Sequence, residues 1–600
     1  MTTPAFPSRT KKPFGFSLLF LTLALASATV AHGQTPPDYS SGVISITDAN
    51  WATATVNGAI GTISGTAVVN ILTSRPARAI TIASVSGGTL NVGTASSGGR
   101  SRVAVASLTG GALDVAQSGF LAVSAASASI SSLNVSGTIT LPNVSNAVLM
   151  VSGTATFGPT CVINGGSINA SSFSVAGGII RSALVGSGAL TKVGEGVATL
   201  RGANTFSGGT TISEGTLSVT GATLVGNVAN SGTLLFEQDS NAPFAGVISG
   251  VGQLFKTGVG ALRLTGNNTY SGTTTISTGT LIVTTASLPG SPVVNNAVLQ
   301  FNQTRNGTFA GSISGTGSLL KTQTGNVVLS GLNSYTGGTT IDGGILVATT
   351  ASLPAGGAVV NNATLQFNQG GASGEFDGLI TGSGAVINGT SGDTVLTANN
   401  SYSGSTSVLR GQLYINGNQS SANGAVSVAS AATLGGKGTV GGATTIASGG
   451  KHRFGTTPTV DDVTPGTQTF VSSLTYEGGA TAYWTLTDNT TDSTDYNRAV
   501  VGTTLTVDPT AVLNLSFDLT GSTVDWSNAF WSSEKLDTAG WLVYNANTLS
   551  VSGDIFELNP PSRWIDSTGV SLQAARPDYV FAFYQDSAEG DLYLNYIYSP

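Results

Sequence analysis

Residues 250–283 read GVGQLFKTGVGALRLTGNNTYSGTTTISTGTLIV, and this stretch decides the fold. Related stretches begin at Gly186, Gly315 and Gly382, so one motif occurs four times with starts about 65 residues apart. Each copy contains short alternating apolar segments separated by Gly, Asn and Ser, which is the pattern of β-strands joined by turns. Self-similarity at a fixed period is typical of proteins that stack their repeats against one another.

The leucines of the strand-like pieces set the size of a turn of the fold. Leu200, Leu217 and Leu234 are 17 residues apart, which is too short for two parallel strands joined by a helix. This spacing fits strands linked by turns into coils, with each coil paired to the next. One repeat then holds roughly three coils of about 21 residues. The sequence therefore predicts an all-β fold, a right-handed parallel β-helix, which is a β-solenoid of the pectin-lyase-like type.

The same pattern predicts which side chains face the interior. Leu217, Leu281 and Leu346 are expected to be equivalent inward positions, whereas Thr274 is expected to face outward. The four motif copies are expected to superpose after a translation along the helix axis. Of 600 residues, 82 are Gly and only 8% are charged, whereas a typical globular protein has about 25% charged residues. Stacked outward ladders of Thr, Ser and Asn explain this, because like charges on neighbouring strands repel.

The N-terminal residues 1–33 have the pattern of a secretory signal peptide. Arg9, Lys11 and Lys12 precede an apolar segment over residues 14–26, which is too short to span a bilayer as a helix. We expect cleavage after Gly33 or after Ala28. No later segment is apolar enough for a transmembrane helix, so none is predicted in the mature chain. The one cysteine, Cys161, is expected to be a small buried residue, and no disulfide is predicted.

The composition predicts four regions along the chain. Residues 1–33 are the signal peptide, residues 34–183 are irregular β-helix coils, and residues 184–450 carry the four repeats. Residues 451–600 contain five of the six Trp, with 18 acidic and 6 basic residues, so a boundary near residue 450 and a C-terminal β-rich capping module are predicted. We expect this module to be a β-sandwich-like cap with its aromatic residues in the core.

The motifs resemble the autotransporter-associated β-strand repeat, also called the passenger-associated transport repeat. The resemblance rests on Gly-x-Gly-x-Leu-x-Lys at 250–256, Asn-Thr-Tyr-Ser-Gly at 268–272 and Thr-Thr-Ile-x-x-Gly-x-Leu at 274–281. It covers residues 184–420 directly, and TDYNRAVV from Thr494 resembles the end region of similar proteins. The resemblance implies a β-helical passenger of a bacterial surface or secreted protein. In many members a C-terminal outer-membrane barrel delivers the passenger.

Catalytic chemistry is not indicated by the residues of the mature chain. The acidic residues of the repeats do not recur at the repeat spacing and so are not expected to cluster: Glu195, Glu214, Glu237, Asp239, Asp342, Glu375, Asp377 and Asp393. The mature chain has one histidine, His452, expected to be a solvated turn residue, so no Ser/His/Asp arrangement is predicted. No catalytic, cofactor-binding or metal-binding residue is assigned, and no cofactor is predicted.

Two other patterns have a structural and a functional interpretation. Asp488, Asp492 and Asp495 collect in DNTTDSTD, which is interpreted as a solvated loop, with calcium binding as the alternative. The aromatic residues Phe206, Tyr270, Tyr335 and Tyr402 occupy one motif position. They are interpreted as corner residues that pack on the coil below, with stacking on sugars as the alternative.

The sequence thus favours an exported, non-catalytic protein at the cell surface, associated with the outer membrane or extracellular, that works as a scaffold or adhesin. Glycans or other cell-surface components are the expected partners, and a monomer is expected. Nucleic acid is disfavoured by a pI of about 4.9. One alternative is a carbohydrate-active β-helix enzyme. A second alternative makes the C-terminal region an outer-membrane barrel anchor.

Overall fold

The computed structural model describes part of the chain, and the predicted signal peptide lies outside the described residues. It describes residues 36–600 except 42, 48–58, 65–66, 73–79, 88, 93–100, 106–111, 117–118, 124–126, 143–146, 456–464, 518–520, 552–554 and 587. The chain divides into two compact units, residues 1–125 and residues 126–600. In the described parts of both units, no helix has the length and apolar character needed to cross a lipid bilayer.

The first unit is a stack of short parallel strands in two rows, β1-β3-β5-β7 and β2-β4-β6-β8. Their bounds are β1 Val43–Thr47, β2 Ala59–Ile63, β3 Val68–Leu72, β4 Ile80–Val85, β5 Thr89–Val92, β6 Ser101–Val105, β7 Ala112–Val115 and β8 Gly119–Val123. Ile71, Val92 and Val115 occupy one register position and are fully buried. On the outward face, Asn91 Nδ2 donates to Asn70 Oδ1 at 2.7 Å. The predicted ladder of polar side chains is therefore present here.

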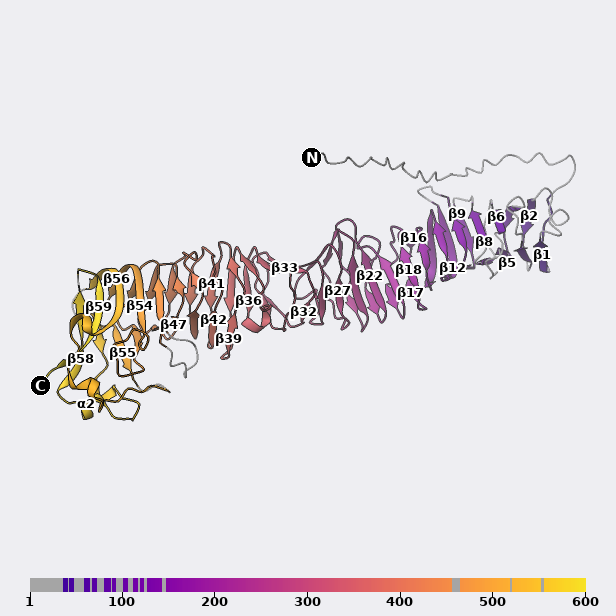
Figure 1. The fold of residues 1–600 in the computed structure, drawn as a ribbon. Coiled ribbons are helices and arrows are strands. Elements are labelled where there is room, and N and C mark those ends of the chain that lie inside the picture. The colour runs from indigo at the N-terminus through magenta and orange to yellow at the C-terminus, as the bar shows by residue number, and fades with distance from the viewer. Residues whose placement is uncertain are drawn as a thin grey trace, which may run out of the picture. The chain divides into compact units, whose positions relative to one another are not determined.

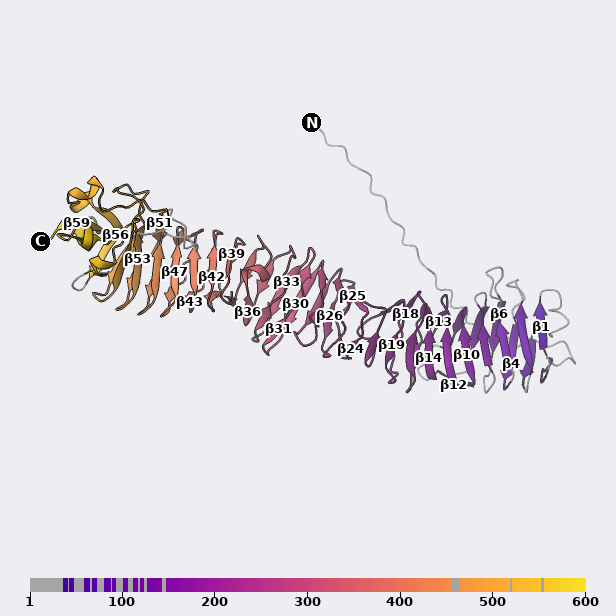
Figure 2. The ribbon, with the colours of Figure 1, turned by 90° about the horizontal axis from the view of Figure 1, so that it is seen from below.

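The second unit is a longer stack of coils (Figures 1 and 2). Its strands fall into five rows. Row one contains β9 Ser127–Ile130, β10 Ser132–Val135, β12 Val148–Phe157, β14 Ser167–Val175, β16 Ala183–Val185, β17 Ala189–Lys192, β19 Thr210–Ile212, β21 Val228–Asn230 and β24 Ile248–Ser249. Row two contains β11 Thr138–Thr140, β13 Val162–Asn164, β15 Gly178–Ile180, β18 Val197–Leu200, β20 Thr216–Val219, β22 Thr233–Glu237, β25 Gln253–Thr257, β27 Thr274–Ile276, β29 Val293–Asn295 and β32 Ile313–Ser314.

The remaining three rows continue the stack toward the C-terminus. Row three contains β23 Ala242–Phe244, β26 Ala261–Leu264, β28 Thr280–Val283, β30 Val298–Asn302, β33 Ser318–Thr322, β35 Thr339–Ile341, β37 Val359–Asn361 and β40 Ile380–Thr381. Row four contains β31 Gly307–Phe309, β34 Val327–Leu329, β36 Ile345–Ala348, β38 Thr364–Phe367, β41 Ala385–Asn388, β43 Thr406–Val408, β45 Asn418–Gln419, β46 Val426–Val428, β48 Thr439–Val440, β49 Thr444–Ile446, β51 Thr467–Phe470, β52 Leu474–Tyr476, β54 Arg498–Val507, β56 Trp541–Val551, β58 Tyr579–Asp586 and β59 Asp591–Tyr598. Row five contains β39 Ser373–Phe376, β42 Asp393–Leu396, β44 Gln412–Ile415, β47 Thr433–Gly436, β50 Lys451–Phe454, β53 Thr481–Thr485, β55 Val512–Ser516 and β57 Glu557–Leu558.

The pairing between coils confirms the predicted all-β parallel solenoid. Leu217 on β20 pairs with Leu234 on β22, which pairs with Leu254 on β25, and all three are fully buried. Leu281 pairs with Leu299 in the same way on row three. Inward leucines of successive coils therefore lie on one another, and their burial supplies the core of the column.

The four motif copies begin on four different rows, at β17, β25, β33 and β41. The prediction that they superpose by translation alone is therefore wrong. Partners in neighbouring coils are about 20 residues apart, as in the pair Leu254 and Thr274. A repeat of about 65 residues is slightly more than three such coils. Each new copy consequently starts further around the column than the copy before it.

Thr274 faces the interior, so the predicted outward orientation is wrong. Its exposed fraction is 0%, and it pairs with Leu254 on one side and Val293 on the other. Its Oγ1 atom lies 2.6 Å from Oη of Tyr270, and this hydrogen bond satisfies a hydroxyl that would otherwise be buried without a partner. In Thr-Thr-Ile the first and third residues face inward, and the middle residue, Thr275, is only partly buried.

Parallel pairing continues past residue 450, where the composition changes. Lys451 on β50 pairs with Thr481 on β53, which pairs with Val512 on β55. The last parallel neighbours are β54 with β56 and β55 with β57. The shift in charge and Trp content therefore occurs within a continuous ladder of coils, because backbone hydrogen bonds pair the coils whichever side chains they carry.

The last strands close the stack with a change of direction. β59 pairs antiparallel with both β56 and β58, so the ladder ends in a hairpin. Beside this hairpin lie short helices: η3 Ala529–Ser532, η4 Asp537–Ala539, η5 Pro561–Arg563 and α2 Leu572–Ala575, while η2 Thr350–Ser352 lies among the repeats. Trp526, Trp531 and Trp541 are fully buried here, with ring centroids 4.7 Å apart for Trp526 and Trp531. The aromatic residues form a core as expected, but this core packs against coils and a hairpin, not inside a β-sandwich.

Candidate functional site

His452 lies inside the column, so its prediction as a solvated turn residue is wrong. It occupies an inward position on β50 and has an exposed fraction of 0%. Nδ1 lies 2.5 Å from Oη of Tyr476, and Nε2 lies 2.9 Å from Oε1 of Gln468. Burial lowers the pKa of His452 to about 4, so the ring is neutral at neutral pH. A buried ring with both nitrogens engaged does not reach a substrate in solvent.

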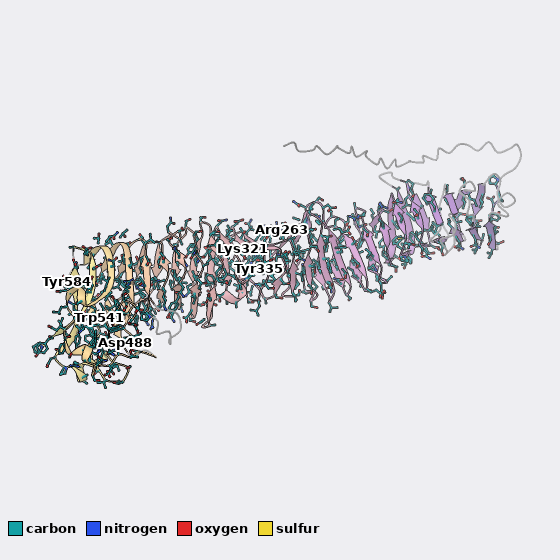
Figure 3. All side chains as sticks on the ribbon, viewed as in Figure 1. Arg263, Lys321, Tyr335, Asp488, Trp541 and Tyr584 are labelled. Carbon is teal, nitrogen blue, oxygen red and sulfur yellow. The ribbon has the colours of Figure 1, made fainter. Side chains whose placement is uncertain are left out.

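Hydrogen bonds hold the carboxylates of Asp488 and Asp492 in the DNTTDSTD loop. Asp492 accepts from the backbone N and the Oγ1 of Thr494, each at 3.0 Å, and these bonds lower the pKa of Asp492. Asp488, marked in Figure 3, accepts from Oγ1 of Thr523 at 2.6 Å. Partial burial and the nearby Asp488 and Asp492 raise the pKa of Asp495. Within the described ranges, no three His, Cys, Asp or Glu side chains gather to hold a metal ion.

The acidic residues of the repeats cap neighbouring groups individually. Glu214 Oε1 accepts from the backbone N of Gly194 at 2.7 Å, and Asp377 Oδ1 accepts from the backbone N of Gly356 at 2.6 Å. Glu237 forms an ion pair with Arg201. Each of these acidic groups therefore ties its own coil to another coil. Cys161 is fully buried, and burial raises the pKa of its thiol to about 12, which keeps the sulfur protonated.

The aromatic position of the motif is structural, as predicted. Phe206, Tyr270, Tyr335 and Tyr402 have exposed fractions of 1% or less. The Oη atom of Tyr335 lies 2.6 Å from Oγ1 of Thr339, and the other two tyrosines make the equivalent bond to a threonine four residues later. These rings fill corners of the column and present no face to solvent, so they do not stack on sugars.

The motif lysine is a buried clamp whose role the sequence pattern alone did not reveal. Lys192, Lys256 and Lys321 have exposed fractions of 0%. Nζ of Lys321 donates to the carbonyl oxygens of Thr322, Gln323 and Gly343, each at 2.8 Å. Gly343 belongs to the next coil, so the ammonium group holds two coils together. Burial lowers the pKa of Lys321 to about 8.

The motif asparagine joins three successive coils. Oδ1 of Asn268 accepts from the backbone N of Ile248 at 2.8 Å, and its Nδ2 donates to the backbone O of Ser287 at 2.6 Å. Asn204 and Asn333 make the same pair of bonds. Ile248 lies on β24, the last strand of row one. The amide side chain thus replaces the backbone ladder where a row ends, which explains why this motif position is Asn.

A hollow of about 590 Å³ lies on the outer surface, where one corner of four successive coils meets solvent. Its lining residues are polar or small: Arg263, Thr284, Thr285, Ala286, Asn302, Gln303, Thr304, Arg305, Asn306 and Gln323. They come from β26, from the last residue of β30 and from the turns that follow β28, β30 and β33. Arg263 is labelled in Figure 3. The lining contains two guanidinium groups and no carboxylate. The sequence pattern does not single out these residues; the one visible signal is that Arg305 stands where the preceding repeat has Ser240.

A family model named passenger-associated-transport-repeat matches the chain four times. The matched residues are 190–219, 254–283, 319–348 and 391–415. Each match lies within one motif copy, and all four include the buried aromatic and asparagine positions. The matches are confined to the second unit of the fold.

A curated relative carries a similar sequence over a short stretch. The chain is 45% identical over 114 residues to the Adhesin BmaC autotransporter of Brucella suis biovar 1 (strain 1330). This stretch is 19% of the present chain and 3% of the relative. The four repeated motifs of this chain thus match the passenger-associated-transport-repeat model, and they stack as coils of one parallel β-solenoid.

Proposed function

We propose that this chain is an exported, non-catalytic passenger that works as a scaffold or adhesin at the bacterial cell surface. The observation that carries the proposal is the presence of four passenger-associated transport repeats in one stack of coils. The similarity to a stretch of an autotransporter adhesin supports the same role. A signal peptide over residues 1–33 accounts for export across the inner membrane.

The geometry of the polar residues supports a binding function over catalysis. General acid–base chemistry needs titratable groups within reach of one bound substrate. His452 is sealed in the column, and carboxylates such as Glu214 and Asp377 are engaged in capping separate turns. A long regular column instead offers a wide outer surface on which glycans or other cell-surface components can dock.

Cell-surface display is tested in cells that make the full chain with an epitope tag inserted at the exposed loop tip Gly356. The proposal expects the tag to react with antibody on intact cells and to be lost after protease treatment of those cells. A tag detectable only after lysis would contradict surface exposure. A periplasmic protein detected in the same cells controls for leakage.

Binding and catalysis are separated with the purified mature chain. We expect saturable binding to glycan arrays and to whole cells, without turnover of any polysaccharide in a panel. Turnover that one carboxylate substitution, such as Asp393→Asn, abolishes would favour the carbohydrate-active enzyme instead. A monomer is expected by light scattering, since the proposal needs no second copy.

A further inference from the structure

We propose that the hollow between Arg263 and Arg305 binds the carboxylate or sulfate groups of an acidic polysaccharide. The inference rests on the proposed surface-binding function and names a ligand class for it. It is carried by the shape, the charge and the fixed framework of this one hollow.

The framework of the hollow is held from beneath by a buried side chain. Gln303 has an exposed fraction of 5%, and its Oε1 accepts from the backbone N of Thr285 at 2.8 Å. Its Nε2 donates to the backbone O of Arg305 at 2.8 Å and to that of Asn326 at 2.9 Å. One amide therefore fixes the turn that carries Thr285 and the turn that carries Arg305. Binding does not first have to order these turns, which favours affinity.

A close approach between coils completes the framework. A Cβ atom at Gly307 would lie only 1.9 Å from Oγ1 of Thr285, so the lack of a side chain lets the two turns meet. The backbone N of Asn326 donates to Oδ1 of Asn306 at 2.9 Å, which ties the far wall to the next coil. The hollow is thus built by the fold and is ready in the free protein.

The charge of the hollow is local and is not imposed by the repeat. The whole chain has a net charge of −7, yet this lining has two arginines and no acidic residue. One repeat earlier, Glu237 stands in the place of Asn302 and forms an ion pair with Arg201. Here Nη2 of Arg263 instead contacts Oδ1 of the neutral Asn302 at 3.4 Å. Asn302 therefore does not neutralise the positive charge of Arg263.

The lining chemistry fits an anionic sugar chain. A guanidinium group presents a planar fork of N–H donors that matches a carboxylate or sulfate group. Thr284, Thr304 and Asn306 add hydroxyl and amide groups suited to sugar hydroxyls. The volume of about 590 Å³ lies within the range of small-ligand sites, and the hollow opens on the outer surface, so a chain can pass through it. An enclosed site for a free ion would be smaller and deeper.

The test measures binding of the full mature chain to immobilised polygalacturonate and dextran sulfate, with neutral dextran as the matched uncharged probe. We expect binding to the two polyanions that weakens with salt, and none to neutral dextran. Arg263→Gln and Arg305→Gln should each weaken binding roughly tenfold, the effect of losing one charge-assisted hydrogen-bonding group. Arg201→Gln, an exposed arginine outside the hollow, should leave binding unchanged. Circular dichroism and thermal melting of the variants check that the fold is intact.

Further arms decide between anion sources. Inorganic sulfate and phosphate should compete only at far higher concentration than the polysaccharides, and equal potency per charge would overturn the polysaccharide assignment. Vesicles containing phosphatidylglycerol that bind the chain better than the polysaccharides do would also overturn it. Unchanged polyanion binding in a variant that combines Arg263→Gln with Arg305→Gln would place the site elsewhere. If the chain adheres to cells but binds no polyanion, this inference fails and the proposed function stands. If the chain binds polyanions but does not adhere to cells, the proposed function fails and this inference stands.

Discussion

Nδ1 of His452 lies 2.5 Å from Oη of Tyr476, which lies 2.8 Å from Oη of Tyr544. The other ring nitrogen, Nε2, lies 2.9 Å from Oε1 of Gln468, whose Nε2 donates to the backbone O of Gly435. Because Oε1 only accepts, the ring proton lies on Nε2, and Nδ1 accepts from Tyr476. A proton added at Nδ1 would meet the hydrogen that Tyr476 already donates. Burial therefore favours the neutral ring and outweighs the hydrogen bond to Gln468, which favours the protonated one.

Acid should destabilise the fold through His452. Its pKa is about 4 in the folded chain and about 6.5 in an unfolded chain, so between these values only the unfolded chain binds the proton. The free energy of unfolding should then fall by about 3 kcal/mol as the pH drops through this window. Urea unfolding at a series of pH values measures this. His452→Gln should reduce the slope of the free energy of unfolding against pH by the equivalent of about one proton in this window. Equal slopes in both proteins would show that His452 is not the group responsible.

Lys321→Met should destabilise the second unit. The substitution removes the donor for three buried carbonyl groups in two coils, and each orphaned group costs about 1–3 kcal/mol, reduced where water enters. We expect a loss of at least about 2 kcal/mol in the free energy of unfolding. Lys451→Met, at a half-buried outward position on β50, is the matched control and should change stability by less than about 0.5 kcal/mol. Similar losses for both variants would show that the clamp contributes little.

Asn268→Ala should be more harmful than the same change at its neighbour. Asn268 links Ile248 and Ser287 through a buried amide, and its removal leaves one backbone N and one backbone O without their partner. A loss of about 2 kcal/mol is expected from chemical unfolding. Asn267 is exposed, and Asn267→Ala should be nearly neutral. If the two variants melt alike, the asparagine clamp is not what joins the coils.

Leu281→Ala should open a cavity in the column. Leu281 is fully buried and pairs with Leu262 and Leu299 on adjacent coils, so about 3 kcal/mol should be lost. Ile282, which follows it on the other face of β28, is partly exposed, and Ile282→Ala should cost about 1 kcal/mol or less. Thermal unfolding followed by circular dichroism compares the two. A larger loss of stability for Ile282→Ala than for Leu281→Ala would show that Ile282, and not Leu281, faces the interior.

The sequence predicts the parallel coils because apolar residues recur at the spacing of one coil, as Leu217 and Leu234 do. It does not reveal that Thr274 faces inward, since a Thr suits an outward ladder as well as an interior that contains a tyrosine hydroxyl. His452 was misplaced for the same reason, because only its partners Gln468 and Tyr476 make its burial tolerable. The type of a polar residue limits where its side chain can lie. Whether that side chain is buried depends on hydrogen-bond partners elsewhere in the sequence.

The hollow was beyond prediction for a different reason. Arg263 and Arg305 lie on β26 and just after β30, two coils apart, and only the register of the coils brings them to one corner. The boundary expected near residue 450 also depended on composition. Composition describes the side chains that a coil carries, and it does not show whether the coil pairs with the next one. Lys451 and Thr481 continue the ladder across that point.

The direction of the hydrogen bonds between coils has a mechanical consequence for the second unit. Coils such as those of Leu254 and Thr274 are joined along the axis, so a pull on the two ends loads the bonds of one coil at a time instead of a whole sheet in shear. Each coil that peels away releases about 20 residues, or about 70 Å of extended chain. Under tension this unit should therefore lengthen in many small steps, absorbing work at each one while the remaining coils stay folded.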